Sequence, residues 1–293
     1  MNLMLYTIQN EFLTVKIESV GAELHSIRHQ NGCEYLWQGD PAYWGEHAPW
    51  LFPICSHLWE DRYLYRGRSY TLCSRNFTHK TDFSVLSHTA SAITLALFAD
   101  KQTKVSYPFD FTFTVSYRLE GEALHTSVTV QNNGTEVMPF SFGAHPGFNI
   151  PLESGSDFGD WYLDFGEESA LDEILLSPNV YLDGRRIALP LTDGKLRLAH
   201  GLFTLDGRFF ARVPNKVTLK SERSPRFITI DFPEAPYLGL WSKPYSDAPL
   251  LCIEPWHGLP SYDGIVDDMD TKNDMYRLLP AHKKIFQLTY TFG

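Results

Sequence analysis

The chain has 293 residues, 25 of them basic and 35 acidic, and its net charge of -10 makes nucleic acid and anionic membranes poor candidates for the main partner. A hydrophobic content of 43% argues against a disordered chain. An aromatic content of 14% favours a β-rich fold, because aromatic side chains suit pleated surfaces.

The first segment, "MNLMLYTIQNEFLTVKIES", alternates apolar with polar residues and lacks the basic region of a signal peptide, so it predicts a strand. No apolar run approaches the length of a membrane span. The four cysteines show no C-x-x-C spacing. With so few cysteines in a long chain, we expect reduced thiols and a cytoplasmic protein.

Alternation with a period of two dominates the rest of the chain. The clearest predicted hairpin joins "FDFTFTVSYRL", residues 109–119, to "ALHTSVTV", residues 123–130. Further strands or hairpins are expected at residues 63–72, 137–142, 215–232 and 284–293. The best helical candidates are short and lie around residues 42–45 and 269–279.

No fixed-period repeat is visible, and no linker rich in Pro, Gly or Ser divides the chain. The patterns therefore predict one all-β domain over residues 1–293, built as a large antiparallel β-sandwich. Sandwiches of this kind hold ligands in loops and on concave faces.

The segment "FGAHPGFNI", residues 142–150, holds His145 in a stiff turn with apolar neighbours. Gly143 and Gly147 allow close approach of another group, and the proline after the histidine fixes the backbone. A lone histidine usually satisfies a buried backbone group. A rigid, partly desolvated imidazole is also a good general acid or base near neutral pH.

The segment "LLCIEPWHG", residues 250–258, places Glu254 at the end of an apolar strand. A carboxylate there is costly unless it is paired, so it either caps a turn or serves as a general base whose pKa is set by burial. Trp256 beside it suggests a sugar ligand, because apolar sugar faces stack on aromatic rings. The aromatic residues of "YLWQGDPAYWGEHAPWLF", residues 35–52, support a sugar site, although most of them are expected in the core.

Other catalytic signatures are missing from the sequence. It contains no G-x-S-x-G, Walker A or H-E-x-x-H motif, and its eleven histidines show no zinc-ligand spacing. The alternatives that these motifs would indicate are therefore discounted.

The motifs A-H-P-G-F-N and C-I-E-P-W, in this order, resemble the aldose 1-epimerase (galactose mutarotase-like) superfamily, and within it the LacX-type mutarotase-related proteins. The resemblance covers essentially the whole chain and includes "VGAELHSI" (20–27), "YLWQGDPAYWGEHAPWLFPI" (35–54), "LFTLDGRFFA" (202–211) and "YLGLWSKPYSDAPLLCIEPWHGLP" (237–260). It implies a β-sandwich of the large supersandwich type and a cofactor-free enzyme that interconverts the α and β anomers of an aldose.

The resemblance also implies roles for three residues. His145 matches the general acid that protonates the ring oxygen, and Glu254 matches the base that takes the proton of the anomeric hydroxyl. The ring opens to the aldehyde, the C1–C2 bond rotates, and closure reverses the roles. Asp206, before an aromatic strand, matches an aspartate that accepts hydrogen bonds from sugar hydroxyls.

The chain departs from this family in two sugar-binding motifs. Relatives read "LFPIVGRL" where this chain reads "LFPICSHL", so His57 replaces an arginine. They also read "HGFAR" where this chain reads "RNFTH", so Arg75 replaces a histidine and His79 an arginine. Two interpretations stay open: these positions have drifted in a member that no longer binds the usual sugar, or Arg75 and His57 keep a donor pair with changed reach. The acid–base pair is retained in both.

Three alternatives stay open. The first is a non-catalytic carbohydrate-binding or sensing protein, because fold does not fix function. The second is a hexose-phosphate mutarotase that uses a basic cluster, although a solvated hairpin face is favoured for these residues: Arg62, Arg66, Arg68, Arg75 and Lys80. The third, a glycoside hydrolase, is weaker because the partner of Glu254 is a histidine. The expected partner is a small-molecule sugar, and the chain is expected to be a monomer or a weak homodimer.

Overall fold

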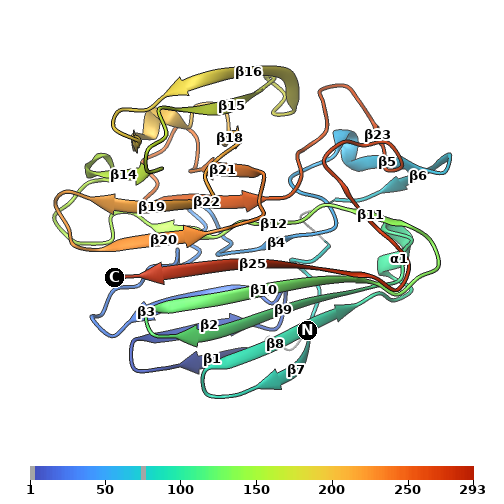
Figure 1. The fold of residues 1–293 in the computed structure, drawn as a ribbon, viewed down its shortest axis with the longest axis horizontal. Coiled ribbons are helices and arrows are strands. Elements are labelled where there is room, and N and C mark those ends of the chain that lie inside the picture. Colours follow the sequence, from blue (N-terminus) through green and yellow to red (C-terminus); the bar gives the residue numbers. More distant parts are fainter. Residues whose placement is uncertain (1–3, 74–76) are drawn as a thin grey trace.

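The computed structural model describes residues 4–73 and 77–293, and its strands form two large antiparallel sheets (Figure 1). The first sheet has nine strands in the order β17 (Lys195–Arg197), β14 (Trp161–Asp164), β19 (Lys216–Ser221), β20 (Phe227–Asp231), β25 (Lys283–Phe292), β10 (Ala123–Asn132), β9 (Phe111–Glu120), β8 (Ala92–Phe98) and β7 (Ser84–His88). The second has the order β16 (Leu182–Pro190), β15 (Ala170–Leu176), β18 (Arg208–Ala211), β21 (Tyr237–Trp241), β22 (Leu250–Trp256), β12 (Gly143–Ala144) and β4 (Trp50–Leu51), and β13 (Gly147–Asn149) also pairs with β22. The predicted all-β class and antiparallel sandwich are confirmed.

Smaller elements complete the fold. A three-stranded sheet contains β1 (Leu5–Gln9), β2 (Leu13–Glu18) and β3 (Leu24–His29). The remaining strands are β11 (Met138–Phe140) paired with β24 (Tyr276–Leu278), and β23 (Asp267–Asp268), β5 (Arg62–Tyr65) and β6 (Arg68–Thr71) in one small sheet. The helices among the described residues are α1 (Thr103–Ser106) and the 3-10 turns η1 (Trp59–Asp61), η3 (Phe158–Asp160) and η4 (His200–Leu202). In the part of the chain that the structure describes, no helix is long and apolar enough to cross a membrane.

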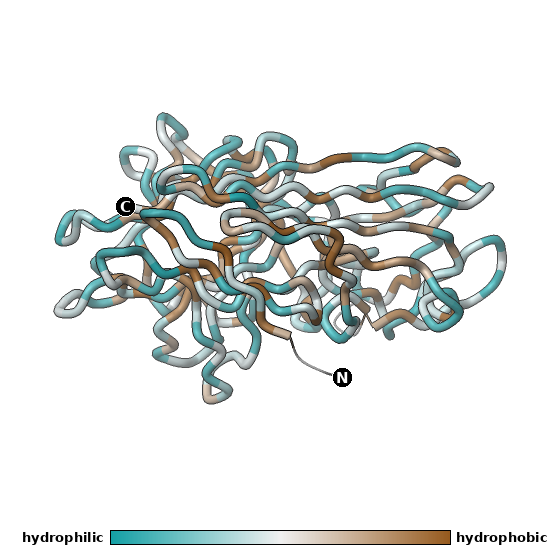
Figure 2. The backbone as a smooth tube through the Cα atoms, turned by 90° about the horizontal axis from the view of Figure 1, so that it is seen from below, coloured by the Kyte–Doolittle hydropathy of each residue, from teal (hydrophilic) through white to brown (hydrophobic). Residues whose placement is uncertain are grey.

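The main core lies between the two large sheets. Along β9, β10 and β25, buried and more exposed residues alternate, as the sequence pattern predicts. Figure 2 shows this alternation of hydrophobic and hydrophilic residues along the long strands. Contacts such as Phe142 with Phe286 on β25, at 4.9 Å between ring centroids, join the two sheets across the core.

The predicted hairpins are confirmed. β9 pairs with β10, and β19 pairs with β20. β5 and β6 pair around Arg66 and Gly67, which have φ values of 49° and 72°. Positive φ at both central residues is what a tight two-residue hairpin turn requires.

Both predicted helices are wrong. Residues 42–45 form a turn, because Asp40 accepts hydrogen bonds from the backbone N–H groups of Ala42, Tyr43 and Trp44. In residues 269–279, the carbonyl of Asp268 closes one turn with the N–H of Lys272, and the chain then continues as β24.

The N-terminal segment forms two strands, β1 and β2, where a single strand was predicted. The side chain of Asn10 accepts hydrogen bonds from the backbone N–H groups of Phe12 and Leu13, at 2.9 and 2.8 Å, and so reverses the chain.

Strand β22 is buried on both of its faces. Leu251 and Ile253 point into the main core between the sheets. Cys252 and Trp256 belong to two separate apolar clusters outside that core. Because alternate residues of a strand point to opposite faces, Glu254 lies on the same outer face as these two residues.

Candidate active site

A cavity of about 400 Å³ lies on the outer face of the second large sheet. Strands β4, β18, β21 and β22 line it, together with the loops after β3, β4, β6 and β12 and the segment just before β18. The described residues that line it are Trp44, Gly45, Glu46, Leu51, Ser56, His57, His79, His145, Asp206, Phe209, Trp241, Glu254 and Trp256. The lining thus combines imidazoles, carboxylates and aromatic rings.

His145 occupies the bend between β12 and β13, and its loop is fixed from both sides. Its backbone N–H donates to the carbonyl of Pro49, and the carbonyl of Pro146 accepts from Ile253 on β22. A Cβ atom at Gly143 would lie 2.7 Å from Trp256, and one at Gly147 would lie 2.7 Å from Trp44. The close approach predicted at both glycines is therefore confirmed.

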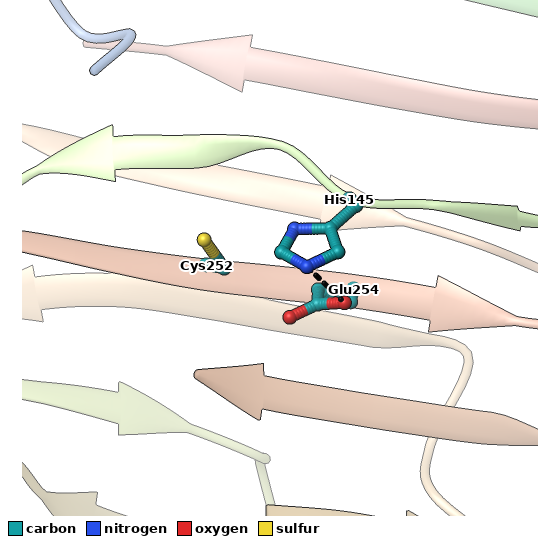
Figure 3. A group of neighbouring side chains, drawn as sticks. All are labelled: His145, Cys252 and Glu254. Atoms are coloured by element: carbon teal, nitrogen blue, oxygen red, sulfur yellow. Dashed lines mark ion pairs between the residues drawn. The ribbon is translucent and has the colours of Figure 1, made fainter. Parts of the chain in front are cut away.

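Glu254 lies within β22, opposite Gly239 of β21, and is therefore not at a strand end as the sequence suggested. Its side chain is 2% exposed, and its Oε2 lies 3.3 Å from the Nε2 of His145. Figure 3 shows the imidazole pointing from its bend to this carboxylate. Burial raises the pKa of Glu254 well above its usual range, and the nearby charge of Asp206 raises it further.

Asp206 lies just before β18, the aromatic strand "RFFA", as the sequence predicts. Its Oδ1 accepts a hydrogen bond from the indole Nε1 of Trp241 at 2.8 Å. The carboxylate is half-buried in the cavity wall, so it can accept hydrogen bonds from a ligand while Trp241 fixes its orientation.

Trp256 and His57 also line the cavity, and the side chains of both contact other groups of the protein. Trp256 is 3% exposed and packs on Phe209, with ring centroids 4.7 Å apart. The Nε2 of His57 is 3.0 Å from the carbonyl of Val180, and its Nδ1 is 3.0 Å from the hydroxyl of Ser56. Trp256 therefore forms an apolar part of the cavity wall. Both ring nitrogens of His57 already have hydrogen-bond partners in the protein.

Arg75 lies outside the residues that the structure describes. His79 borders the cavity, and its Nδ1 is 3.5 Å from the Oε1 of Glu46. The donor pair predicted for Arg75 and His57 therefore stays a prediction.

The basic residues of the β5–β6 hairpin lie away from the cavity. Arg62 pairs with Glu60, and Arg66 pairs with Glu136 at 2.7 Å, in both cases between exposed side chains. No Lys or Arg occurs among the described residues that line the cavity. This arrangement agrees with the solvated hairpin face that the sequence favoured.

Two groups of side chains among the described residues bring possible metal ligands within 4.8 Å of one another, namely His145 with Cys252 and Glu254, and Glu18 with Glu23 and His25. Cys252 is completely buried, and burial raises the pKa of its thiol well above the usual value, so the sulfur keeps its proton. In the second group Glu23 already accepts hydrogen bonds from the backbone N–H groups of His47 and Ala48. Both groups are therefore poor metal sites, and a cofactor-free site stays a prediction.

Sequence reasoning assigned no role to Glu46 or Trp241, although both lie on the cavity wall. Trp241 ends a strand whose alternate residues Leu238 and Leu240 face the main core. The period-two pattern could have placed Trp241 on the outer face, beside Gly239.

Comparisons with known proteins identify the relatives of the chain. Residues 4–167 match the aldose 1-epimerase family. The plasmid-encoded protein LacX of Lactococcus lactis subsp. lactis is 32% identical over 293 residues, covering 96% of this chain and 98% of that protein.

Two solved structures share the fold over nearly their whole length. The galactose mutarotase related enzyme from Lactobacillus acidophilus has a TM-score of 0.92 and 34% identity, covering 99% of this chain and 97% of that one. A galactose mutarotase-like protein from Lactobacillus casei ATCC 334 has a TM-score of 0.93 and 30% identity, covering 99% and 100%. The chain therefore belongs to the aldose 1-epimerase family.

Proposed function

We propose that residues 1–293 act as one mutarotase domain that interconverts the α and β anomers of an unphosphorylated aldose. The observation that carries this proposal is the 3.3 Å separation of the His145 and Glu254 side chains at the cavity wall. The ring oxygen and the anomeric oxygen of an aldose share one carbon atom. Two proton-transfer groups this close together can therefore reach both oxygens of one bound sugar.

In the proposed reaction, Glu254 removes the proton of the anomeric hydroxyl while protonated His145 gives a proton to the ring oxygen. The C1–O bond of the ring breaks, and C1 becomes an aldehyde carbon. After rotation about C1–C2, the ring oxygen attacks the other face of C1. His145 then recovers its proton from that oxygen, and Glu254 returns its proton to the anomeric oxygen. No net proton, electron or atom is gained or lost.

The surroundings suit this chemistry. Burial raises the pKa of Glu254, and a carboxylate with a raised pKa accepts a proton more readily than an ordinary carboxylate. Asp206 would accept hydrogen bonds from sugar hydroxyls, and Trp256 would contribute apolar wall. We place the reaction in the cytoplasm, where the four free cysteines would stay reduced, in a monomer or weak homodimer.

Anomer conversion tests the function directly. Polarimetry or proton NMR of freshly dissolved α-glucose and α-galactose should show equilibration faster with the protein than without it. Binding of either sugar without acceleration would support the non-catalytic carbohydrate-binding alternative. If the protein neither binds any aldose of a panel nor accelerates its equilibration, both the mutarotase and the carbohydrate-binding functions are excluded.

Asp206→Asn is expected to raise KM about tenfold or more, because a hydrogen bond to a charged group contributes about 1.5–3 kcal/mol.

The same substitution should also shift the acidic limb of the kcat/KM profile to lower pH. The charge of Asp206 raises the pKa of Glu254, so its removal keeps Glu254 ionised at lower pH. The rate constants are measured across the acidic and neutral pH range, with the exposed Asp193→Asn as control. An unmoved acidic limb would contradict the assigned coupling.

Glucose 6-phosphate is expected to bind no more tightly than glucose. The described lining of the cavity contains three carboxylates, Glu46, Asp206 and Glu254, which would repel a phosphate group. Calorimetry with both sugars at low and high salt checks this expectation. Tighter, salt-sensitive binding of the phosphate ester would favour the hexose-phosphate alternative.

A further inference from the structure

The imidazole of His145 lies in a corner made by two tryptophan side chains. The ring of Trp44 stacks on it, with centroids 5.0 Å apart and an interplanar angle of 27°. Trp241 meets His145 edge-on at 6.3 Å and Trp44 at 5.7 Å. One face of the imidazole is therefore covered by an aromatic ring, which restricts rotation of the His145 side chain.

Trp44 is itself fixed within its loop. Its backbone N–H donates to the carbonyl of Asp40 at 2.9 Å, and its own carbonyl accepts from the indole Nε1 of Trp37 at 2.7 Å. A little further along the loop, the buried carboxylate of Glu23 accepts the backbone N–H of His47 at 2.8 Å. The indole thus belongs to a rigid wall and not to a loose loop.

The two loops that carry Trp44 and His145 are bonded to each other. The N–H of Gly147 donates to the carbonyl of His47 at 2.8 Å, and the N–H of His145 donates to that of Pro49 at 3.1 Å. Gly147 also leaves the space that the indole occupies, because a Cβ there would lie 2.7 Å from Trp44 Cζ3. The stack therefore depends on both the tryptophan and the glycine.

We propose that Trp44 is a positioning residue that holds the His145 ring at the angle needed for proton transfer to the sugar ring oxygen. This inference rests on the proposed role of His145 as the acid. A free imidazole can rotate about two side-chain torsions, and proton transfer tolerates little misplacement. The stack and the carboxylate of Glu254 at 3.3 Å together restrict the orientation of the ring in the cavity.

Three variants test the proposal. Trp44→Leu removes the aromatic face, and kcat should fall about 10- to 100-fold with little change in KM, because misplacement of about 1 Å can cost 10²-fold. Trp44→Phe keeps a ring at the same place and should recover most of kcat. Gly147→Ala should imitate Trp44→Leu, because its methyl group occupies space that the indole needs.

Matched controls separate positioning from general damage. Gly201→Ala adds a methyl group where no atom lies within 4 Å, and Trp59→Leu removes a tryptophan outside the cavity lining. Both should keep wild-type kcat. Thermal denaturation of all five variants shows which of them are folded.

NMR of the His145 ring protons provides a readout that does not depend on activity. The indole shifts these protons by its ring current, so the shift should disappear in Trp44→Leu and Gly147→Ala and remain in Trp44→Phe. A raised KM with unchanged kcat in Trp44→Leu would overturn the proposal, because it would make Trp44 a sugar-stacking surface. The proposal would also be overturned if Trp44→Leu and Gly147→Ala both lost the ring-current shift but kept wild-type kcat, because the stack would then have no effect on catalysis. If wild-type protein shows the shift but no mutarotation, the proposed function fails, and not the packing of His145.

Discussion

Glu254→Gln is expected to lower kcat for anomer conversion about 10²- to 10⁴-fold, which is the range that a positioned acid or base contributes. The amide has nearly the shape of the carboxylate but cannot accept the proton of the anomeric hydroxyl. Because the side chain is 2% exposed, water cannot easily take its place. Sugar binding should survive, since Asp206 remains in the wall.

The same substitution is expected to raise the thermal stability at pH 7. The pKa of Glu254 is raised by burial in the folded protein, so ionisation of this group opposes folding at pH values above its ordinary pKa. An amide carries no charge to desolvate. A higher Tm combined with a lower kcat would show that the buried carboxylate is kept for function at a cost in stability.

Glu46→Gln is the matched control for this prediction. It removes a negative charge from the same cavity, but from a side chain that is 43% exposed and lies 3.5 Å from the Nδ1 of His79. Its effect on kcat should be far smaller. Equal losses in the two variants, or full activity of Glu254→Gln in polarimetry, would contradict the assignment of Glu254 as the base.

Strands with one solvated face could be predicted from the sequence, because there the hydrophobic pattern is local. The pairing of β9 with β10 follows from two alternating segments and the short turn between them. The segment 269–279 could not be predicted in the same way. Its strand Tyr276–Leu278 pairs with Met138–Phe140, which lies more than a hundred residues earlier, and a one-turn bend at Asp268 imitates the start of a helix.

The candidate site was partly predictable for a related reason. His145 and Glu254 are recognisable because each breaks an apolar segment with a titratable group. Their 3.3 Å separation depends on β12 and β13 both pairing with β22, which no local pattern encodes. The stack of Trp44 on His145 depends in addition on a hydrogen-bonded contact between two loops. The part of the wall contributed by Trp241 could have been predicted, because its strand places Leu238 and Leu240 in the core and Trp241 on the opposite face.

His145→Ala is expected to lower kcat about 10²- to 10⁴-fold, because the ring oxygen loses its proton donor while Glu254 still takes the anomeric proton. The substitution leaves a space beside Trp44 into which free imidazole can diffuse, since the His145 side chain is 21% exposed to the cavity. Added imidazole should therefore restore part of the activity of His145→Ala and none of the activity of Glu254→Gln. The rate in the same imidazole buffer without protein is subtracted.

The double variant His145→Ala, Glu254→Gln decides whether the two residues act as a pair. If His145 and Glu254 transfer protons in the same step, either single change already removes concerted catalysis. The kcat of the double variant should then be only slightly lower than that of the less active single variant. The loss would be far smaller than the product of the two single losses. Polarimetry under identical conditions measures all three rates. If the losses in kcat of the two single variants instead multiply in the double variant, the two groups at 3.3 Å act in different steps. A concerted opening of the sugar ring would then be wrong.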